Sequence, residues 1–199
     1  MTARTIAIAA LVATGCVSYS GGARPFDPSR VGSEPGWIIA AATPEVRQRG
    51  QLDCGAAALA MVAGRWKIQV SVNSSIIPAP SKNGIPLGNL RSAARHYGLD
   101  AYAIKGDHAT LDHELRAGRP VIVGLLRPYS RSKATSHYEV VIAMRADEVV
   151  TLDPAKAGWR VRTRAAFDAE WRPAAYPALV VLGPRPGVTQ LQLSPLPGT

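Results

Sequence analysis

Cys54 shows the strongest signs of chemical reactivity in this sequence. Residues 53–65 predict a helix with Asp53 as its N-cap, so Cys54 falls in the first helical turn. Backbone N–H groups and the positive end of the helix dipole favour the thiolate form of a cysteine there. Gly55 leaves room for a substrate backbone to approach. The sequence therefore predicts that Cys54 is a nucleophile, and the alternative is a buried, inert thiol.

A cysteine nucleophile needs a base, and the chain holds four histidines. His137 opens the apolar run 137–144, which predicts a strand, so its imidazole would be held rigidly yet open to substrate. The others are more simply interpreted as surface residues, because His96 ends a predicted helix and His108 and His113 flank a short polar one. We therefore expect His137 to be the base rather than a surface histidine at a strand end.

Asp153 is the expected partner of that base. The runs 137–144 and 148–152 predict an antiparallel hairpin, which places His137 and Asp153 at the same end of adjacent strands. A carboxylate in that position accepts a hydrogen bond from the imidazole and fixes its tautomer. Taken alone, Asp153 before Pro154 would be interpreted as a turn residue.

Gln48 is the candidate for an oxyanion hole. It precedes Cys54 by six residues, so that its side-chain amide and the backbone N–H of Cys54 would together stabilise the charge developing on a carbonyl oxygen. Gln51 is the rival donor and ranks second, since its shorter spacing places it in the turn next to the nucleophile. We expect no metal or cofactor, because two cysteines and dispersed histidines form no ligand cluster.

The order of the predicted elements indicates the fold class. Apolar spacing predicts helices before most of the strands: helices over 53–65, 86–96 and 109–117, and strands over 37–42, 101–105, 120–126, 137–144, 148–152 and 178–182. Parallel α/β folds alternate their elements, so this segregation predicts an α+β fold with a mostly antiparallel sheet. A chain of 199 residues that is 47% hydrophobic fits one compact domain.

The N-terminus predicts export. A short basic region and an apolar run form an expected signal peptide over residues 1–15, too short to span a bilayer permanently. Its end, Ala13-Thr14-Gly15-Cys16, resembles a bacterial lipobox with Ala13 in place of the usual Leu, and predicts that Cys16 is acylated. The alternative is an ordinary cleaved signal with an incidental cysteine. Val17, where Asp would indicate retention at the inner membrane, favours the outer membrane facing the periplasm.

Lipidation of Cys16 would leave Cys54 without a disulfide partner in an oxidising compartment, which again favours a reactive role. The Gly-, Ser- and Pro-rich composition after the leader predicts a lipidated, flexible tether over residues 16–43. The domain itself is expected over residues 44–183, and the Pro-rich residues 184–199 predict an extended C-terminal tail.

The net charge of +9 by itself fits nucleic acid, anionic lipid or an acidic peptide. The basic residues are scattered and only 6% of residues are aromatic, so no basic stripe with stacking aromatics predicts nucleic-acid binding. The chain holds no phosphate-binding loop of the ATPase type. A solvated basic surface is the simplest interpretation, and the oligomeric state stays open.

Several motifs together resemble a known family, the double-glycine leader peptidases found at the front of bacteriocin exporters. The motifs lie between Pro44 and Leu182, and they are residues 48–62, Gly84-Ile-Pro-Leu87, residues 97–99, residues 118–123, His137-Tyr-Glu-Val-Val141 and Asp153-Pro154. The resemblance implies a papain-like fold and cleavage after a Gly-Gly pair. It also implies a triad of Cys54, His137 and Asp153, with Gln48 in the oxyanion hole.

The exporter-type members are cytoplasmic and fused to membrane and ATPase segments, whereas the leader here predicts an exported, stand-alone lipoprotein form. The first hypothesis is therefore a cysteine endopeptidase that cuts an exported peptide or protein after small residues. A second is a non-catalytic module of the same fold that binds a peptide during secretion or assembly. A third is amide or acyl transfer at the cell envelope, because an acyl-enzyme can be resolved by an amine as well as by water.

Overall fold

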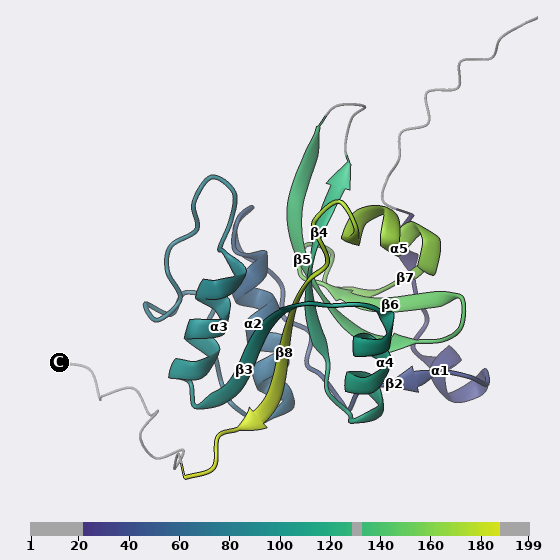
Figure 1. Ribbon diagram of the computed structural model, residues 1–199, viewed down its shortest axis with the longest axis horizontal. Helices are drawn as coiled ribbons and strands as arrows, with labels where there is room; N and C mark the ends of the chain where they lie inside the picture. Colours follow the sequence, from purple (N-terminus) through teal and green to yellow (C-terminus); the bar gives the residue numbers. More distant parts are fainter. Residues whose placement is uncertain (1–21, 129–132, 188–199) are drawn as a thin grey trace, which may run out of the picture.

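The computed structural model describes residues 22–128 and 133–187, which form an antiparallel sheet with helices on both faces (Figure 1). The strand order is β1-β7-β6-β5-β4-β8-β3, and β2 pairs with β5 beside this path. The strands are β1 (Arg24–Pro25), β2 (Ile38–Ile39), β3 (Leu99–Lys105), β4 (Val121–Pro128), β5 (Ala134–Met144), β6 (Glu148–Asp153), β7 (Gly158–Thr163) and β8 (Pro177–Pro184). The predicted α+β class with an antiparallel sheet is confirmed.

Two helices cover each face of the sheet (Figure 1). The helices are α1 (Ser29–Ser33), α2 (Cys54–Arg65), α3 (Leu87–His96), α4 (His108–Arg116) and α5 (Arg164–Trp171). Helices α2 and α3 pack on the face built around Val140 and Ile142, while α4 and α5 pack on the face built around Val141 and Val123. Successive strand residues point to opposite faces, so one apolar strand supplies both cores.

Helix α2 is buried along most of its length because its residues are small. Every residue from 54 to 63 is buried, and alanines let the helix lie close to the sheet. At Gly55 a Cβ would lie 3.0 Å from Leu90 and 3.1 Å from Tyr138. The expectation that Gly55 makes room for a substrate is therefore wrong: its missing side chain lets α2 approach α3 and β5.

Asp53 is the N-cap residue of α2, as predicted, but its side chain makes no capping hydrogen bond. Its carboxylate instead accepts from the backbone N–H groups of Arg49 and Gly50, at 3.1 Å and 3.0 Å. Asp53 thus closes the loop that carries Gln48 just before α2.

The segment before the domain is more ordered than a tether. Strand β1 pairs with β7, and Phe26 is 6% exposed between Trp37 and Trp159, with ring centroids 5.3 Å and 6.1 Å away. Arg30 and Arg145 form ion pairs with Glu34 and Glu148 beside these rings. The flexible tether expected over residues 16–43 therefore does not include residues 24–40, which join the sheet through β1 at β7 and through β2 at β5.

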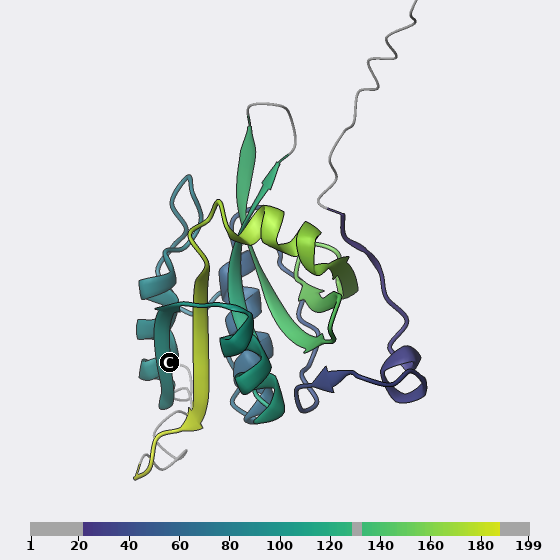
Figure 2. The ribbon, with the colours of Figure 1, turned by 45° about the vertical axis from the view of Figure 1, so that its right-hand side comes forward.

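The hairpin β4–β5 is longer than predicted, and it rises above the rest of the sheet in both ribbon views (Figures 1 and 2). Strand β5 begins at Ala134, so His137 pairs with Leu125 inside the strand rather than opening it. Strand β7 and helix α5 were not predicted, although Trp159-Arg160-Val161-Arg162 alternates apolar and charged residues as a half-buried strand does. Within the described residues, no helix is long and apolar enough to cross a bilayer.

Candidate active site

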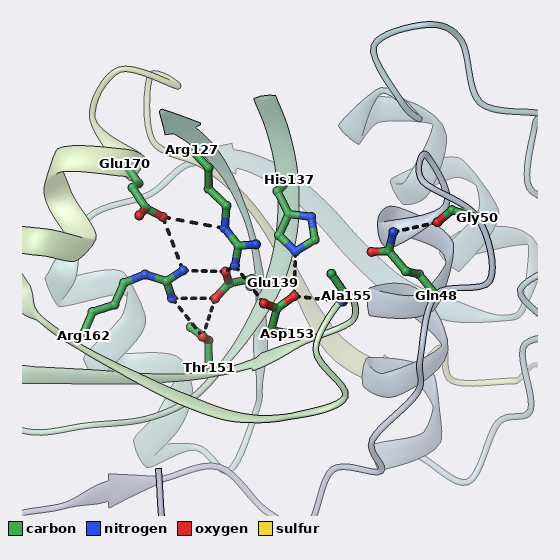
Figure 3. Close-up of polar contacts among 10 residues, drawn as sticks. All are labelled: Gln48, Gly50, Arg127, His137, Glu139, Thr151, Asp153, Ala155, Arg162 and Glu170. Atoms are coloured by element: carbon green, nitrogen blue, oxygen red, sulfur yellow. Dashed lines mark hydrogen bonds and ion pairs between the residues drawn. The ribbon is translucent and has the colours of Figure 1, made fainter. Parts of the chain in front are cut away.

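Cys54, His137 and Asp153 come together from one helix and two adjacent strands. Cys54 begins α2, His137 lies in β5 and Asp153 ends β6. The Nε2 atom of His137 lies 2.8 Å from Oδ1 of Asp153, and both side chains are buried (Figure 3). The backbone N–H of Tyr138, the next residue after His137, faces the thiol of Cys54 and lowers its pKa. The predicted hairpin geometry therefore brings these residues to one place.

The charge state of Asp153 fixes the hydrogen-bond direction. Burial by itself would raise the pKa of Asp153, but the hydrogen bond with His137 and the charge of Arg127 hold that pKa well below its usual range. The backbone N–H of Ala155 adds a further hydrogen bond to Oδ1 at 2.9 Å. Because an ionised carboxylate only accepts, His137 must donate from Nε2. Its Nδ1 lone pair is then left to accept a proton.

Burial governs the resting state of the other two groups. Burial raises the pKa of the Cys54 thiol, and the backbone N–H groups of Tyr138 and Gly55 lower it by less. Burial likewise lowers the pKa of His137, against the raising effect of its hydrogen bond with Asp153. The helix start thus acts on Cys54 in the predicted direction but is outweighed, and both groups are neutral at rest.

Gln48 is joined to the same site by its backbone. Its N–H donates to the carbonyl of Pro154 at 3.0 Å, which links the loop before α2 to the residue after Asp153. The side-chain Nε2 donates to the carbonyl of Gly50 at 2.6 Å, and Oε1 is buried without a hydrogen bond (Figure 3). One Nε2 hydrogen remains for another acceptor. Gln51, the rival donor, is exposed and lines a separate groove.

The remaining histidines lie away from this site. His96 and His113 are exposed. His108 is not a free surface residue as expected, since its Nε2 lies 3.0 Å from Asp168 and its side chain is 26% exposed. This pair joins α4 to α5 next to Trp171. Among the described histidines, His137 alone adjoins a residue, Tyr138, whose backbone N–H faces the thiol of Cys54.

Two grooves border the residues of this site. One of about 430 Å³ is lined by His137, Tyr138, Gly124, Pro177 and the loop around residues 81–86. At Gly124 a Cβ would lie 2.9 Å from Pro177 and 3.3 Å from Tyr138, so Gly124 packs closely against both. A second groove of about 900 Å³ runs past Asp53 and has mostly apolar side chains, among them Val72, Ile77, Pro78 and Ile85. The grooves thus adjoin His137 on one side and the residue before Cys54 on the other.

Sequence reasoning missed a cluster of charged residues behind Asp153. We call it the ion cluster, and its members are Arg127, Glu139, Asp153, Arg162 and Glu170 (Figure 3). The available signal was Glu139, an acidic residue inside the apolar run of β5. Ligand atoms of His137, Glu139 and Asp153 lie within 4.8 Å of one another, but both carboxylates already bind arginine. The positive charges beside these carboxylates are supplied by the guanidinium groups of Arg127 and Arg162.

A cysteine at the start of a helix, facing a histidine and an aspartate on an antiparallel sheet, defines the papain-like class of fold. The sequence comparison gives the family: the profile of the Peptidase C39 family matches residues 42–177, and the chain belongs to this family. No curated protein sequence matches the chain.

Solved structures agree with this assignment. A double-glycine-motif protease from an AMS/PCAT transporter, crystallised with its leader peptide, is 25% identical with a TM-score of 0.57, covering 72% of this chain and 93% of its own. The peptidase domain of Streptococcus ComA, a bifunctional ABC transporter of a quorum-sensing pathway, is 25% identical with a TM-score of 0.58, covering 69% and 96%. A C39-like peptidase from Bacillus anthracis, 18% identical with a TM-score of 0.58, covers 73% and 97% and shares the fold.

Proposed function

We propose that this protein is a cysteine endopeptidase with Cys54 as nucleophile, His137 as base and Asp153 as the residue that orients the base. The observation that carries the proposal is the hydrogen bond of 2.8 Å between His137 and Asp153, one residue from the backbone N–H that faces Cys54. Membership of a cysteine peptidase family supports it.

The geometry supports a general-base mechanism. Because thiol and imidazole are both neutral at rest, the proton of Cys54 passes to Nδ1 of His137 as Sγ attacks the substrate carbonyl. The imidazolium that forms is stabilised by the carboxylate of Asp153, and it then protonates the leaving amine. A water molecule, activated by His137, hydrolyses the acyl-enzyme and restores the thiol.

Gln48 is proposed as the side-chain donor of the oxyanion hole. The N–H of Cys54 lies in the first turn of α2, where backbone donors have no partner within the helix. The amide of Gln48 has one hydrogen that is not used by Gly50. Removing such a donor costs about 3–4 kcal/mol of transition-state stabilisation.

The proposed substrate has glycine or another small residue before the cut. The support is membership of the Peptidase C39 family and the likeness to a double-glycine-motif protease, together with a groove of only about 430 Å³ beside His137. The transporter protease crystallised with a leader peptide supports a peptide as ligand for this fold. We propose that the substrate here is an exported peptide or protein.

We also propose export and a lipid anchor on Cys16, at the outer membrane facing the periplasm. The support is the leader and lipobox-like pattern of residues 1–16, which lie outside the described residues. Metabolic labelling with a fatty-acid analogue tests this directly. We expect label on the full chain and none on its Cys16→Ala variant, and label on neither would contradict the anchor.

The activity is tested by incubating the full chain and its Cys54→Ala variant with Gly-Gly peptides and cell-envelope extracts. We expect new peptide N-termini, read by mass spectrometry, only with the unsubstituted protein. Absence of any Cys54-dependent product would sink the peptidase proposal. A Cys54-dependent product whose new C-terminal carbonyl is joined to an added amine as an amide, instead of ending in a free carboxylate, would indicate acyl transfer.

A further inference from the structure

The ion cluster draws one residue from each of five neighbouring elements. Arg127 comes from β4, Glu139 from β5, Asp153 from β6, Arg162 from β7 and Glu170 from α5. These side chains lie on the sheet face that α5 covers, and Glu139, Arg162 and Glu170 are completely buried (Figure 3). So much charge in one buried place needs close pairing to be tolerated.

Arg127 is the member that touches the proposed active site. Its Nη2 lies 3.0 Å from Oδ2 of Asp153, while the other oxygen of that carboxylate faces His137. The carboxylate is therefore held from both sides. Without Arg127 the carboxylate would be held only at Oδ1, by His137 and the N–H of Ala155, and Oδ2 would lose its charged partner.

Arg127 is itself held in place from behind. Its guanidinium forms an ion pair with Glu139 and lies 3.9 Å from Glu170. Glu139 is in turn held by Arg162 through contacts of 2.7 Å to each oxygen, and Thr151 donates to it as well. Glu139 lies two residues from His137 and so points to the same face of β5. One strand thus carries both the proposed base and the residue that anchors Arg127.

We propose that Arg127 is a positioning residue, which fixes the ring and tautomer of His137 through Asp153, with Glu139 and Arg162 as its support. The inference rests on the proposed function, because it assigns Arg127 a role in preparing the proposed base. Three carboxylates face two guanidinium groups in the ion cluster, so it carries one excess negative charge that a protonated His137 balances. The net negative charge of the ion cluster therefore stabilises the imidazolium form of His137 that arises during the reaction.

The test is the protonation state of His137, read by nitrogen NMR of histidine-labelled full chain in a Cys54→Ala background. We expect Nε2–H alone in the parent. In Arg127→Met we expect both tautomers and a titration midpoint higher by about one pH unit, since a nearby positive charge is lost. The charged groups that face His137 or its partners are Asp153, Arg127, Glu139, Arg162 and Glu170.

Matched variants separate positioning from a general loss of structure. Arg119→Met is the control, because Arg119 pairs with Glu114 and is 18% exposed, against 20% for Arg127. We expect it to leave the tautomer and midpoint of His137 unchanged. Arg127→Lys keeps the charge, and we expect a midpoint close to that of the parent. Arg127→Met/Glu170→Gln keeps the charge count, so it serves if the single variant fails to fold, and we expect both tautomers of His137 in it as well.

Asp153 provides the decisive comparison. If Arg127 acts through Asp153, adding Arg127→Met to Asp153→Asn should leave the tautomer ratio of His137 as it is in Asp153→Asn alone. A single Nε2–H tautomer in folded Arg127→Met, or in the Arg127→Met/Glu170→Gln variant, would overturn the inference. Because these spectra need no substrate, they test the role of Arg127 separately from the peptidase activity. If the Arg127 variants change the tautomer of His137 but the unsubstituted protein cleaves no peptide, only the peptidase proposal fails.

Discussion

The two sides of the candidate site are built on different physical terms. On the nucleophile side, α2 buries ten consecutive residues from Cys54 to Ala63 and holds no charged group among them. On the base side, buried carboxylates and guanidinium groups stand behind His137. Shape therefore sets the position of the thiol, whereas charge sets that of the imidazole. The comparison predicts that changes of volume damage the first side and changes of charge the second.

The largest effect on stability is expected from removing a buried charge on the base side. Arg162→Met leaves Glu139 and Glu170 buried with less compensation, and breaking such a pair costs about 3–5 kcal/mol. Urea unfolding followed by circular dichroism measures this loss. Arg116→Met is the control, since its ion pair with Asp112 is 63% exposed at the arginine, and we expect no measurable change. Similar small losses in both variants would contradict the contrast.

A change of volume tests the nucleophile side. Gly55→Ala places a methyl group 3.0 Å from Leu90 and 3.1 Å from Tyr138, and overpacking of this kind costs about 1–3 kcal/mol. The same shift moves Cys54 relative to His137, so peptide cleavage should fall by more than stability alone explains. Gly88→Ala in α3 is the matched control, because no atom lies within 4 Å of its new Cβ.

We expect Gly88→Ala to be neutral or to stabilise the protein by up to about 1 kcal/mol, as alanine favours helix more than glycine does. Thermal midpoints of the two variants, measured side by side, give the comparison. Equal stability for Gly55→Ala and Gly88→Ala would show that α2 has room to spare against α3 and β5.

The proposed nucleophile, base and orienting residue were predictable because their signals are local. Cys54 stands at a helix start, and one hairpin sets the relation of His137 to Asp153. The helix and the hairpin formed where the sequence pattern placed them. Burial of the thiol was not predictable, because it depends on how closely an alanine-rich helix approaches the sheet. For that reason the sequence overstated the activation of Cys54 by the helix start.

The ion cluster could not be predicted from the sequence, for a different reason. Its meaning depends on the register of four strands and on α5, and neither β7 nor α5 was predicted. Arg127 alone resembles any basic residue near the end of a strand. The N-terminal segment was misjudged similarly, since Phe26 finds its aromatic partners at Trp37 and, on the adjacent strand β7, at Trp159. Contacts between distant parts of the chain carry these features.

The groove of about 430 Å³ beside His137 allows a test of the proposed substrate. Gly124→Ala places a methyl group 2.9 Å from Pro177 and 3.3 Å from Tyr138. We expect kcat/KM for Gly-Gly peptides to fall roughly tenfold, because misplacing a bound substrate by a fraction of an ångström weakens catalysis. Alkylation of Cys54 by iodoacetamide should be unchanged, since the small reagent does not need the groove. Loss of both reactions together would indicate damage to the thiol instead.

The smallest expected effect concerns Asp153, which makes the free energy of unfolding depend on pH in acidic solution. The folded protein holds the pKa of Asp153 below its usual value of about 3.9, so the unfolded chain binds its proton more readily. The stability contributed by this carboxylate is therefore present above about pH 4 and is lost as the pH falls further toward the folded value.

In Asp153→Asn the slope of unfolding free energy against pH below 4 should be shallower, by up to about 1.4 kcal/mol per unit. Cys54→Ala should keep the original slope, because burial raises the pKa of that thiol and it does not titrate in acid. Equal slopes in Asp153→Asn and Cys54→Ala would mean that the charge behind His137 does not distinguish the two sides.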